Sequence, residues 1–454
     1  MINNLSISMT KALKIILAII IILFNTLSIL ANTTTTLSPI KITKGNCTQI
    51  PIAINFFAAK SNEEHDLSQN IVSIISNDLN ISKIFAPISS DLFIETEQGV
   101  AHIPLFTAWS QINANILING EITKIDSTDF KVTFVIWDVF SAKEITRQSF
   151  TFPSQLWRST AHKIADQIYK HVTGSKGNFN TKIVYVSESN SSNRKIRRIA
   201  IMDQDGANHS YITNGKNHVI TPVFSPNNNQ ILYVSYHNKI PTVRIHDLNS
   251  GNNKILASFN GITFSPRFSP DGNKILVSNS STKNVTHIYE INLLTGKIKQ
   301  LTKGQSINTS PSYSPDGSKI AFVSDRSGST QIYIMNDQGG NIKRLTSQPG
   351  AYTTPAWSPT NNYIAFTKIE AGEFSIGVIK LDGSNKRIIA TKHLVEGPSW
   401  APDGKTIIFS RAYKATKSTS TKVKLYSVDC TGYNEREIQT PENASDPNWS
   451  NEYE

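Results

Sequence analysis

The chain has 454 residues, 39% of them hydrophobic and 17% charged, which is enough to form the cores of two globular domains. The formal net charge is +11, but the Lys and Arg residues are spread along the chain. The one basic cluster, Arg194 to Arg198, falls between two predicted strands, where a solvated hairpin tip accounts for it, so the composition does not favour a nucleic-acid-binding protein. The spacing of the two cysteines, Cys47 and Cys430, leaves both a bridge and two separate packing residues open.

Residues 1–31 have the pattern of a secretory signal peptide. Lys11 and Lys14 precede the apolar run Ile15 to Leu23, and the small residue Ala31 stands directly before the polar string NTTTT. We predict export with cleavage after Ala31. The alternative is an uncleaved membrane anchor, for which the apolar run is short. No later segment is predicted to cross a bilayer, and no membrane insertion is expected after cleavage.

Residues 32–46 are predicted to form an extended N-terminal tether. Apolar and polar residues alternate over a few positions, which is a strand pattern without a hairpin partner nearby. Such a segment suits docking on the sheet edge of another protein, and the alternative is an ordinary disordered terminus. The residues that carry this pattern are Leu37, Ile40, Lys41, Ile42 and Thr43.

Residues 47–174 are predicted to form one α/β domain, a sheet with helices on one face. Leu67, Ile71, Ile74, Ile75 and Leu79 follow a 3.6-residue period and indicate an amphipathic helix. Strands are expected at 50–57, 91–96, 114–123, 130–140 and 145–152, with a short helix at 105–113 and a long one at 157–172. For the long helix we expect Ser154 as cap, Gly174 as stop, and a surface or cap position for His162 and His171. Residues 175–180 are a predicted linker.

Residues 181–454 carry six copies of a Pro-x-aromatic motif at a nearly fixed period. The copies begin at Pro222, Pro266, Pro311, Pro355, Pro398 and Pro447, which are 44, 45, 44, 43 and 49 residues apart. A tight turn such as Ser-Pro-Asp-Gly follows most copies, and β-rich runs follow each turn. Four strands per period predict the blades of an all-β six-bladed β-propeller.

The two ends of the repeat region complement each other. Residues 182–189, 197–206 and 209–213 supply three strands of a blade without the Pro-aromatic strand, and that strand is present near the C-terminus as PNWS. We therefore predict that the last blade is built from both ends, with Trp449 beside Val184. Such closure leaves no free sheet edge in the ring.

The sequence contains no recognisable catalytic or cofactor motif. It lacks the Gly-x-Ser-x-Gly elbow, a Gly-rich phosphate loop and His spacings typical of zinc sites. The repeated Asp residues belong to the repeated turns. We therefore predict a binding protein without enzymatic activity, cofactor or metal.

The mouth of the central channel is the expected binding surface. The residues just before each motif proline enter the channel, and most of them bear a hydroxyl or a carboxylate. The alternative for each position is an ordinary turn residue. The candidates are Thr221, Ser265, Thr309, Ser310, Thr354, Glu396 and Asp446.

The chain resembles the TolB family of periplasmic propeller proteins from the Tol-Pal envelope system. The resemblance rests on PSYSPDGSKIAFVSDRSGSTQIYIMNDQGG in the repeats, on LWRSTAHKIADQIYKHVTGSKGNFNTKIVYVS across the predicted junction, and on IVSIISNDLNISKIFAPIS in the first helix. The blade motif is shared with other propellers, whereas the junction string is far more specific. At the second blade the family often has a His before the proline, and this chain has Ile262 instead.

The resemblance implies a periplasmic, non-enzymatic adaptor. Such proteins bind the lipoprotein Pal at the propeller mouth and the inner-membrane protein TolA through the tether, and they support outer-membrane invagination during division and outer-membrane integrity. Thr309 best fits the family's Asn-Thr-x-Pro pattern at the mouth. We expect a monomer. Two alternatives stay open: an exported propeller hydrolase or lactonase, and a peptidoglycan-binding propeller.

Overall fold

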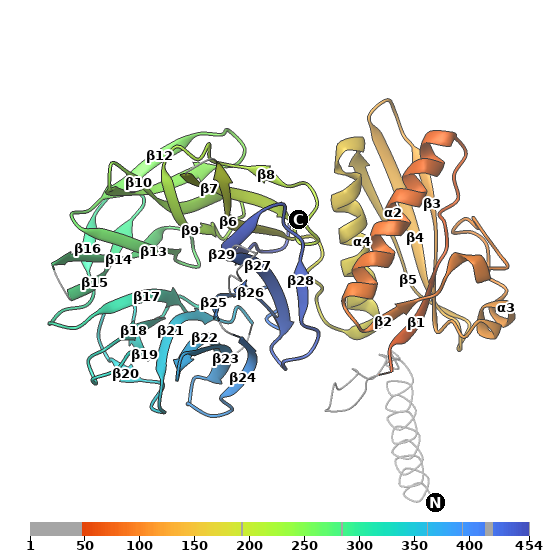
Figure 1. The fold of residues 1–454 in the computed structure, drawn as a ribbon. Helices are drawn as coiled ribbons and strands as arrows, with labels where there is room; N and C mark the ends of the chain where they lie inside the picture. Colours follow the sequence, from red (N-terminus) through yellow and green to blue (C-terminus); the bar gives the residue numbers. More distant parts are fainter. Residues whose placement is uncertain are drawn as a thin grey trace, which may run out of the picture. The chain divides into compact units, whose positions relative to one another are not determined.

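The computed structural model describes residues 48–191, 194–282, 285–360, 362–392, 394–413 and 421–453 (Figure 1). The predicted signal peptide, the predicted tether and Cys47 lie outside these residues, so the cysteine pairing stays untested. Residues 48–171 and 175–454 belong to one compact unit. Of the helices within the described ranges, none is long and apolar enough to span a bilayer.

The N-terminal α/β part contains a five-stranded sheet in the order β2-β1-β3-β4-β5. β1 pairs in parallel with β2 and β3, while β3, β4 and β5 form an antiparallel meander. The helices α2 and α4 lie on one face of the sheet, as predicted (Figure 1). The strands are β1 (Ile50–Ile54), β2 (Phe85–Pro87), β3 (Ile116–Lys124), β4 (Asp129–Asp138) and β5 (Lys143–Pro153). The helices are α2 (Asn62–Ile81), η1 (Ser90–Leu92), α3 (Phe106–Gln111), η2 (Ser154–Leu156) and α4 (Trp157–Thr173).

Local sequence explains where α2 begins. Ser61 is its N-cap: the Ser61 hydroxyl accepts from the Glu64 N–H at 3.3 Å, and the Glu64 carboxylate accepts from the Ser61 N–H at 2.9 Å. This capping box satisfies two N–H groups that the first helical turn leaves free. Ile71, Ile75 and Leu79 from the predicted apolar stripe are buried against the sheet.

Three predictions for the α/β part were wrong. Residues 91–96 are not a strand; the edge strand is β2, directly after α2, because a parallel partner for β1 must return through a crossover helix. Side chains hold the 93–96 segment instead, since Glu95 accepts from the Trp109 indole N–H at 2.9 Å. Ser154 does not cap α4 but begins η2, which has no side-chain cap and leads directly into α4. His162 is not on the surface but 2% exposed.

The second part is a six-bladed propeller, with six four-stranded sheets formed by the described residues (Figure 1). The edge strands β9, β13, β17, β21, β25 and β29 contact one another in turn, and β29 contacts β9, so they form the inner ring. Three blades are β9 (His218–Phe224), β10 (Gln230–His237), β11 (Ile240–Asp247), β12 (Asn253–Ser258); β13 (Ile262–Phe268), β14 (Lys274–Thr282), β15 (Val285–Asn292), β16 (Ile298–Gln300); and β17 (Asn308–Tyr313), β18 (Lys319–Ser324), β19 (Gln331–Asn336), β20 (Lys343–Arg344). The others are β21 (Ala351–Trp357), β22 (Tyr363–Glu370), β23 (Glu373–Lys380), β24 (Arg387–Lys392); β25 (Leu394–Trp400), β26 (Thr406–Tyr413), β27 (Lys422–Asp429), β28 (Arg436–Ile438); and β29 (Asn443–Trp449), β6 (Lys182–Ser191), β7 (Arg194–Asp203), β8 (Ser210–Tyr211).

The last blade is built from both ends of the repeat region, as predicted. β29 pairs antiparallel with β6, in the sheet order β29-β6-β7-β8. Trp449 lies opposite Ile183 rather than the predicted Val184. In this register the Trp449 indole N–H donates to the Thr181 hydroxyl at 2.8 Å, which joins the end of the chain to the start of the ring.

Three pairs of neighbouring blades are also locked together by the residue between proline and aromatic in the motif. The side chains of Ser312, Ser399 and Asn448 accept the backbone N–H of the aromatic residue in the next blade, at 3.0, 3.2 and 2.8 Å. The three donors are Trp357, Trp449 and Phe224. The bond from Phe224 to Asn448 joins the first inner strand to the last one and so closes the ring.

Replacing Asn448 by Ala should lower the free energy of unfolding by about 1–3 kcal/mol, because it leaves the N–H of the buried Phe224 without an acceptor. Chemical denaturation measures this loss. Asn249→Ala, at an exposed turn, is the matched control and should change stability by less than about 0.5 kcal/mol. Equal stability of the two variants would show that this bond does not hold the ring closed.

Candidate functional site

All seven predicted mouth residues lie on the six inner strands. Each inner strand carries a β-bulge just before its motif proline, where the register to the second strand of its blade shifts. Five of the seven directly precede the motif proline, and Thr309 and Glu396 lie one residue earlier, so the structure places all seven at or beside the bulges. They are Thr221 on β9, Ser265 on β13, Thr309 and Ser310 on β17, Thr354 on β21, Glu396 on β25 and Asp446 on β29.

The residue directly before each motif proline has a left-handed backbone. The φ angles are 48° at Thr221, 52° at Ser265, 52° at Ser310, 46° at Thr354, 68° at Gly397 and 50° at Asp446. Five of these six are not glycine, and a proline disfavours helical conformations in the residue before it. Each such residue costs of order 1–3 kcal/mol and persists only where its surroundings hold it. Bulges with this geometry turn side chains away from the usual pleat and cluster near functional sites.

Charged side chains are present on the same ring of strands. The Asp446 carboxylate on β29 accepts from the Thr221 N–H at 3.2 Å. Burial raises the pKa of Asp446, which this hydrogen bond and the positive charges of Arg197 and Arg267 oppose. Burial and the charge of Asp446 both raise the pKa of Glu396. Burial lowers the pKa of Arg267, on β13, to about 10. The inner ring therefore combines hydroxyls with charges of both signs.

The motif turns confirm that their Asp residues have a structural role. The carboxylate of Asp316 accepts from the Ser314 hydroxyl and from the Ser318 backbone N–H, and these bonds lower its pKa to about 2. Asp271 and Asp403 accept turn N–H groups in the same way.

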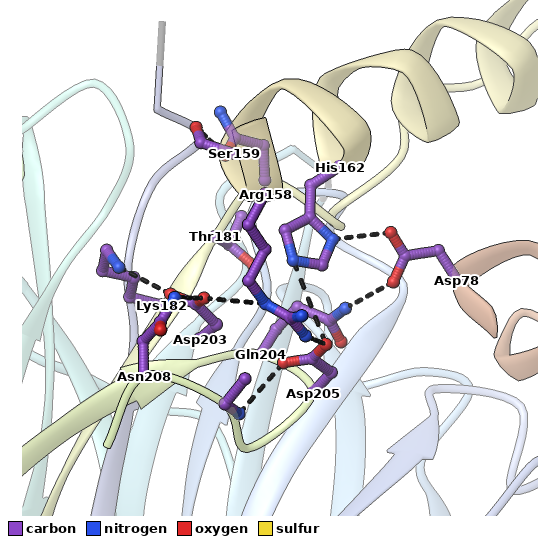
Figure 2. Close-up of polar contacts among 12 residues, drawn as sticks. Asp78, Arg158, Ser159, His162, Thr181, Lys182, Asp203, Gln204, Asp205 and Asn208 are labelled. Atoms are coloured by element: carbon purple, nitrogen blue, oxygen red, sulfur yellow. Dashed lines mark hydrogen bonds and ion pairs between the residues drawn. The ribbon is translucent and has the colours of Figure 1, made fainter. Parts of the chain in front are cut away.

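A second polar cluster lies where α2 and α4 meet the β7–β8 turn (Figure 2). Asp78 on α2 is fully buried and accepts from His162 Nδ1 at 2.6 Å and from the Gln204 side chain at 3.0 Å. The other ring nitrogen of His162 lies 3.9 Å from the Asp205 carboxylate. Burial raises the pKa of Asp78. Burial alone would lower the pKa of His162, but the hydrogen bond and charge of Asp78 raise it.

His162, Asp203 and Asp205 are close enough together to be considered as metal ligands. Other cations already bind both carboxylates: the Arg158 guanidinium pairs with Asp205 and lies 3.5 Å from Asp203, and the Lys182 ammonium is 2.6 Å from Asp203 (Figure 2). A metal ion would have to displace the guanidinium. The cluster therefore fits a buried ion-pair network better than a metal centre.

Asp166 on α4 fixes the predicted linker. It is 4% exposed and accepts from the backbone N–H groups of Phe179 and Asn180, both at 2.9 Å. Gly177 passes so close to this carboxylate that a side chain there would collide with it. Burial raises the pKa of Asp166 to about 7, although the two N–H donors act in the opposite direction.

Sequence reasoning missed both Arg267 and the Asp78–His162 pair. The motif copy PRFSP carried a signal for Arg267, because no other copy has a charged residue between proline and aromatic. His162 was seen, but its partner Asp78 is 84 residues away and no local pattern links them.

The fold defines the class of protein: an α/β part followed by a six-bladed propeller closed by its own ends. Comparison with known proteins then gives the family. The model of the TolB amino-terminal domain matches residues 38–145, and that of the TolB beta propeller domain matches residues 169–453. The chain therefore belongs to the TolB family of the Tol-Pal system.

Similar proteins agree with this family. The Tol-Pal system protein TolB of Orientia tsutsugamushi (strain Ikeda) is 98% identical over 454 residues, which is 100% of both chains. That of Rickettsia peacockii (strain Rustic) is 47% identical over 438 residues, which is 94% of this chain and 98% of the relative. The crystal structure of TolB from Acinetobacter baumannii has a TM-score of 0.78 at 25% identity and covers 89% of this chain and 97% of that one.

The buried Asp166 predicts a specific pH dependence of stability. Its pKa is raised in the folded state to about 7, so the stability it contributes is complete below its unfolded pKa of about 3.9 and is lost as the pH rises through about 7. An Asp166→Asn variant lacks this titration. The variant should therefore gain stability relative to the wild-type chain as the pH rises from 5 to 8, by up to about 1.4 kcal/mol per pH unit in the range where Asp166 titrates.

Urea denaturation of both chains at pH 5 and pH 8 measures the difference. Asp126→Asn, at an exposed turn, is the control for a carboxylate whose pKa is lowered rather than raised. A constant difference between wild type and Asp166→Asn at the two pH values would contradict the prediction.

Proposed function

We propose that this chain is a non-enzymatic periplasmic adaptor that binds the lipoprotein Pal at the propeller mouth and TolA through the tether at residues 37–44. In this role it supports outer-membrane invagination during division and the integrity of the outer membrane. The observation that carries the proposal is the six-fold set of strained bulges, which present hydroxyls and carboxylates on the inner strands. A polar rim on a rigid ring is a suitable protein-docking surface.

The environment of Thr309 supports its place in the docking surface. Its side chain is half-buried and lies next to the left-handed Ser310. The preceding Asn308 is fully buried and accepts from the Ser324 hydroxyl at 3.0 Å and from Arg326 Nη2 at 2.7 Å. Thr309 is thus held by an anchored neighbour and keeps access to solvent, which is what a contact residue requires.

Replacing Thr309 by Arg should abolish Pal capture without unfolding the ring, because the long cation would occupy the docking surface. Pull-down with purified Pal, together with circular dichroism of the variant, measures both properties. Thr295→Arg, on the exposed turn between β15 and β16, introduces the same side chain away from the inner strands and should bind normally. Binding at wild-type strength by Thr309→Arg would refute this residue's role.

We further propose that occupancy of the mouth and release of the tether are coupled, so that each partner shifts the population that binds the other. Deleting residues 32–44 should abolish TolA binding and leave Pal capture intact. Surface plasmon resonance with each partner separately tests the deletion, and the affinity of the wild-type chain for each partner in the presence of the other tests the coupling. Unchanged TolA affinity in the deletion variant would remove the tether from the proposal.

A further inference from the structure

Arg267 stands at a position that three of the other five blades use to contact the next blade. In the other five motif copies the residue between proline and aromatic is uncharged: Val223, Ser312, Ala356, Ser399 and Asn448. Three of these accept an N–H group from the next blade. A guanidinium has five donors and no acceptor, so Arg267 cannot form this lock. Its presence on β13 needs a different explanation.

The guanidinium of Arg267 is poorly paired. Nη1 donates to the carbonyl of the adjacent Pro266 at 2.8 Å, and within the described part of the chain no ion pair to Arg267 is found. The side chain is only half-buried, yet its surroundings disfavour its charge and hold its pKa at about 10. The residue thus keeps some exposure on an inner strand, while the protein around its guanidinium supplies little compensation for the charge.

The charged residues on the inner strands are not evenly distributed around the ring. The carboxylate that acts on Arg267 belongs to Asp446 on β29, and β9 separates that strand from β13 in the ring. Glu396 is on β25, which is three inner strands from β13 in either direction and therefore opposite to it. The inner ring is thus positive on the β13 side and negative on the β25 and β29 side.

We propose that Arg267 is a carboxylate-binding subsite of the propeller mouth, which receives an acidic side chain of the lipoprotein that docks there. The inference rests on the proposed function and names the chemistry of one contact. A guanidinium binds a carboxylate through two parallel hydrogen bonds, which fixes orientation as well as charge. Glu396 on the opposite strand β25 and Asp446 on β29 both repel an anion, so they confine the partner's carboxylate to β13 and set the register of docking.

Arg267→Met separates this role from a structural one. Methionine keeps most of the apolar stem and removes an unpaired charge, so the midpoint of thermal unfolding should stay unchanged or rise. The affinity for Pal should fall about ten- to hundred-fold, and its dependence on salt should weaken, because one charged contact is lost. Arg244→Met on the outer strand β11, where the guanidinium already binds Thr242 and Asn253, is the control and should bind as the wild-type chain does.

A double-mutant cycle identifies the partner group. Each exposed acidic residue of Pal is neutralised singly, and calorimetry measures binding to the wild-type chain and to Arg267→Met. For one acidic residue of Pal, neutralisation should weaken binding to the wild-type chain but should have little further effect on binding to Arg267→Met. Full additivity for every acidic residue would overturn the subsite, as would a joint loss of stability and affinity in Arg267→Met.

The same measurements distinguish this inference from the proposed function. Wild-type affinity in Arg267→Met, with binding lost in Thr309→Arg, would refute the subsite and leave the adaptor role intact. Failure of the wild-type chain to bind Pal at all would refute the adaptor role itself.

Discussion

The ring depends on one backbone conformation that occurs six times, the left-handed residue before each motif proline. This conformation is unfavourable for threonine, serine and aspartate, and the proline that follows makes it more so. Packing compensates for it: all six motif prolines are buried. The motif aromatics contribute to cores that neighbouring blades share, as where Trp400 packs with Ala365 and Phe409. The left-handed residues are therefore stable only in the assembled ring. The bulges that they form in turn set the course of the inner strands.

Closure of the ring involves more than the pairing of β29 with β6. The C-terminal tail continues past Trp449, and Asn451 donates to the Pro226 carbonyl at 2.7 Å while its own N–H binds Asn228 at 2.9 Å. The Asn180 side chain donates to the Tyr453 carbonyl at 2.6 Å. The linker that Asp166 holds is thus also the segment that receives the end of the chain, so α4 and the closing blade share one set of contacts.

Repetition explains how much of this fold could be read from the sequence. The Pro-x-aromatic motif recurs six times, and this repetition was enough to predict the blades, their strands and the closure of the ring. Elements that occur only once were harder to predict. Residues 91–96 are suited to a strand, but the parallel partner of β1 is the short strand β2, which begins at Phe85. The bulges were not predicted, because left-handed residues are usually glycine and only Gly397 fits that rule. The motif was enough to place the seven candidate residues on the inner strands, whereas the surroundings of Arg267 and the burial of His162 depend on contacts distant in sequence.

Two groups of charged side chains in this chain have opposite characters. Near α4, each charge has partners: Asp78 with His162 and Gln204, and Asp205 with Arg158. Such networks hold parts of a fold in a defined arrangement while contributing little net stability. Inside the ring, Arg267 and Asp446 influence each other without forming an ion pair, and neither gains the full compensation that contact would give. A charge left in this state lowers stability in the free protein, and a contact supplied by a partner would offset that cost.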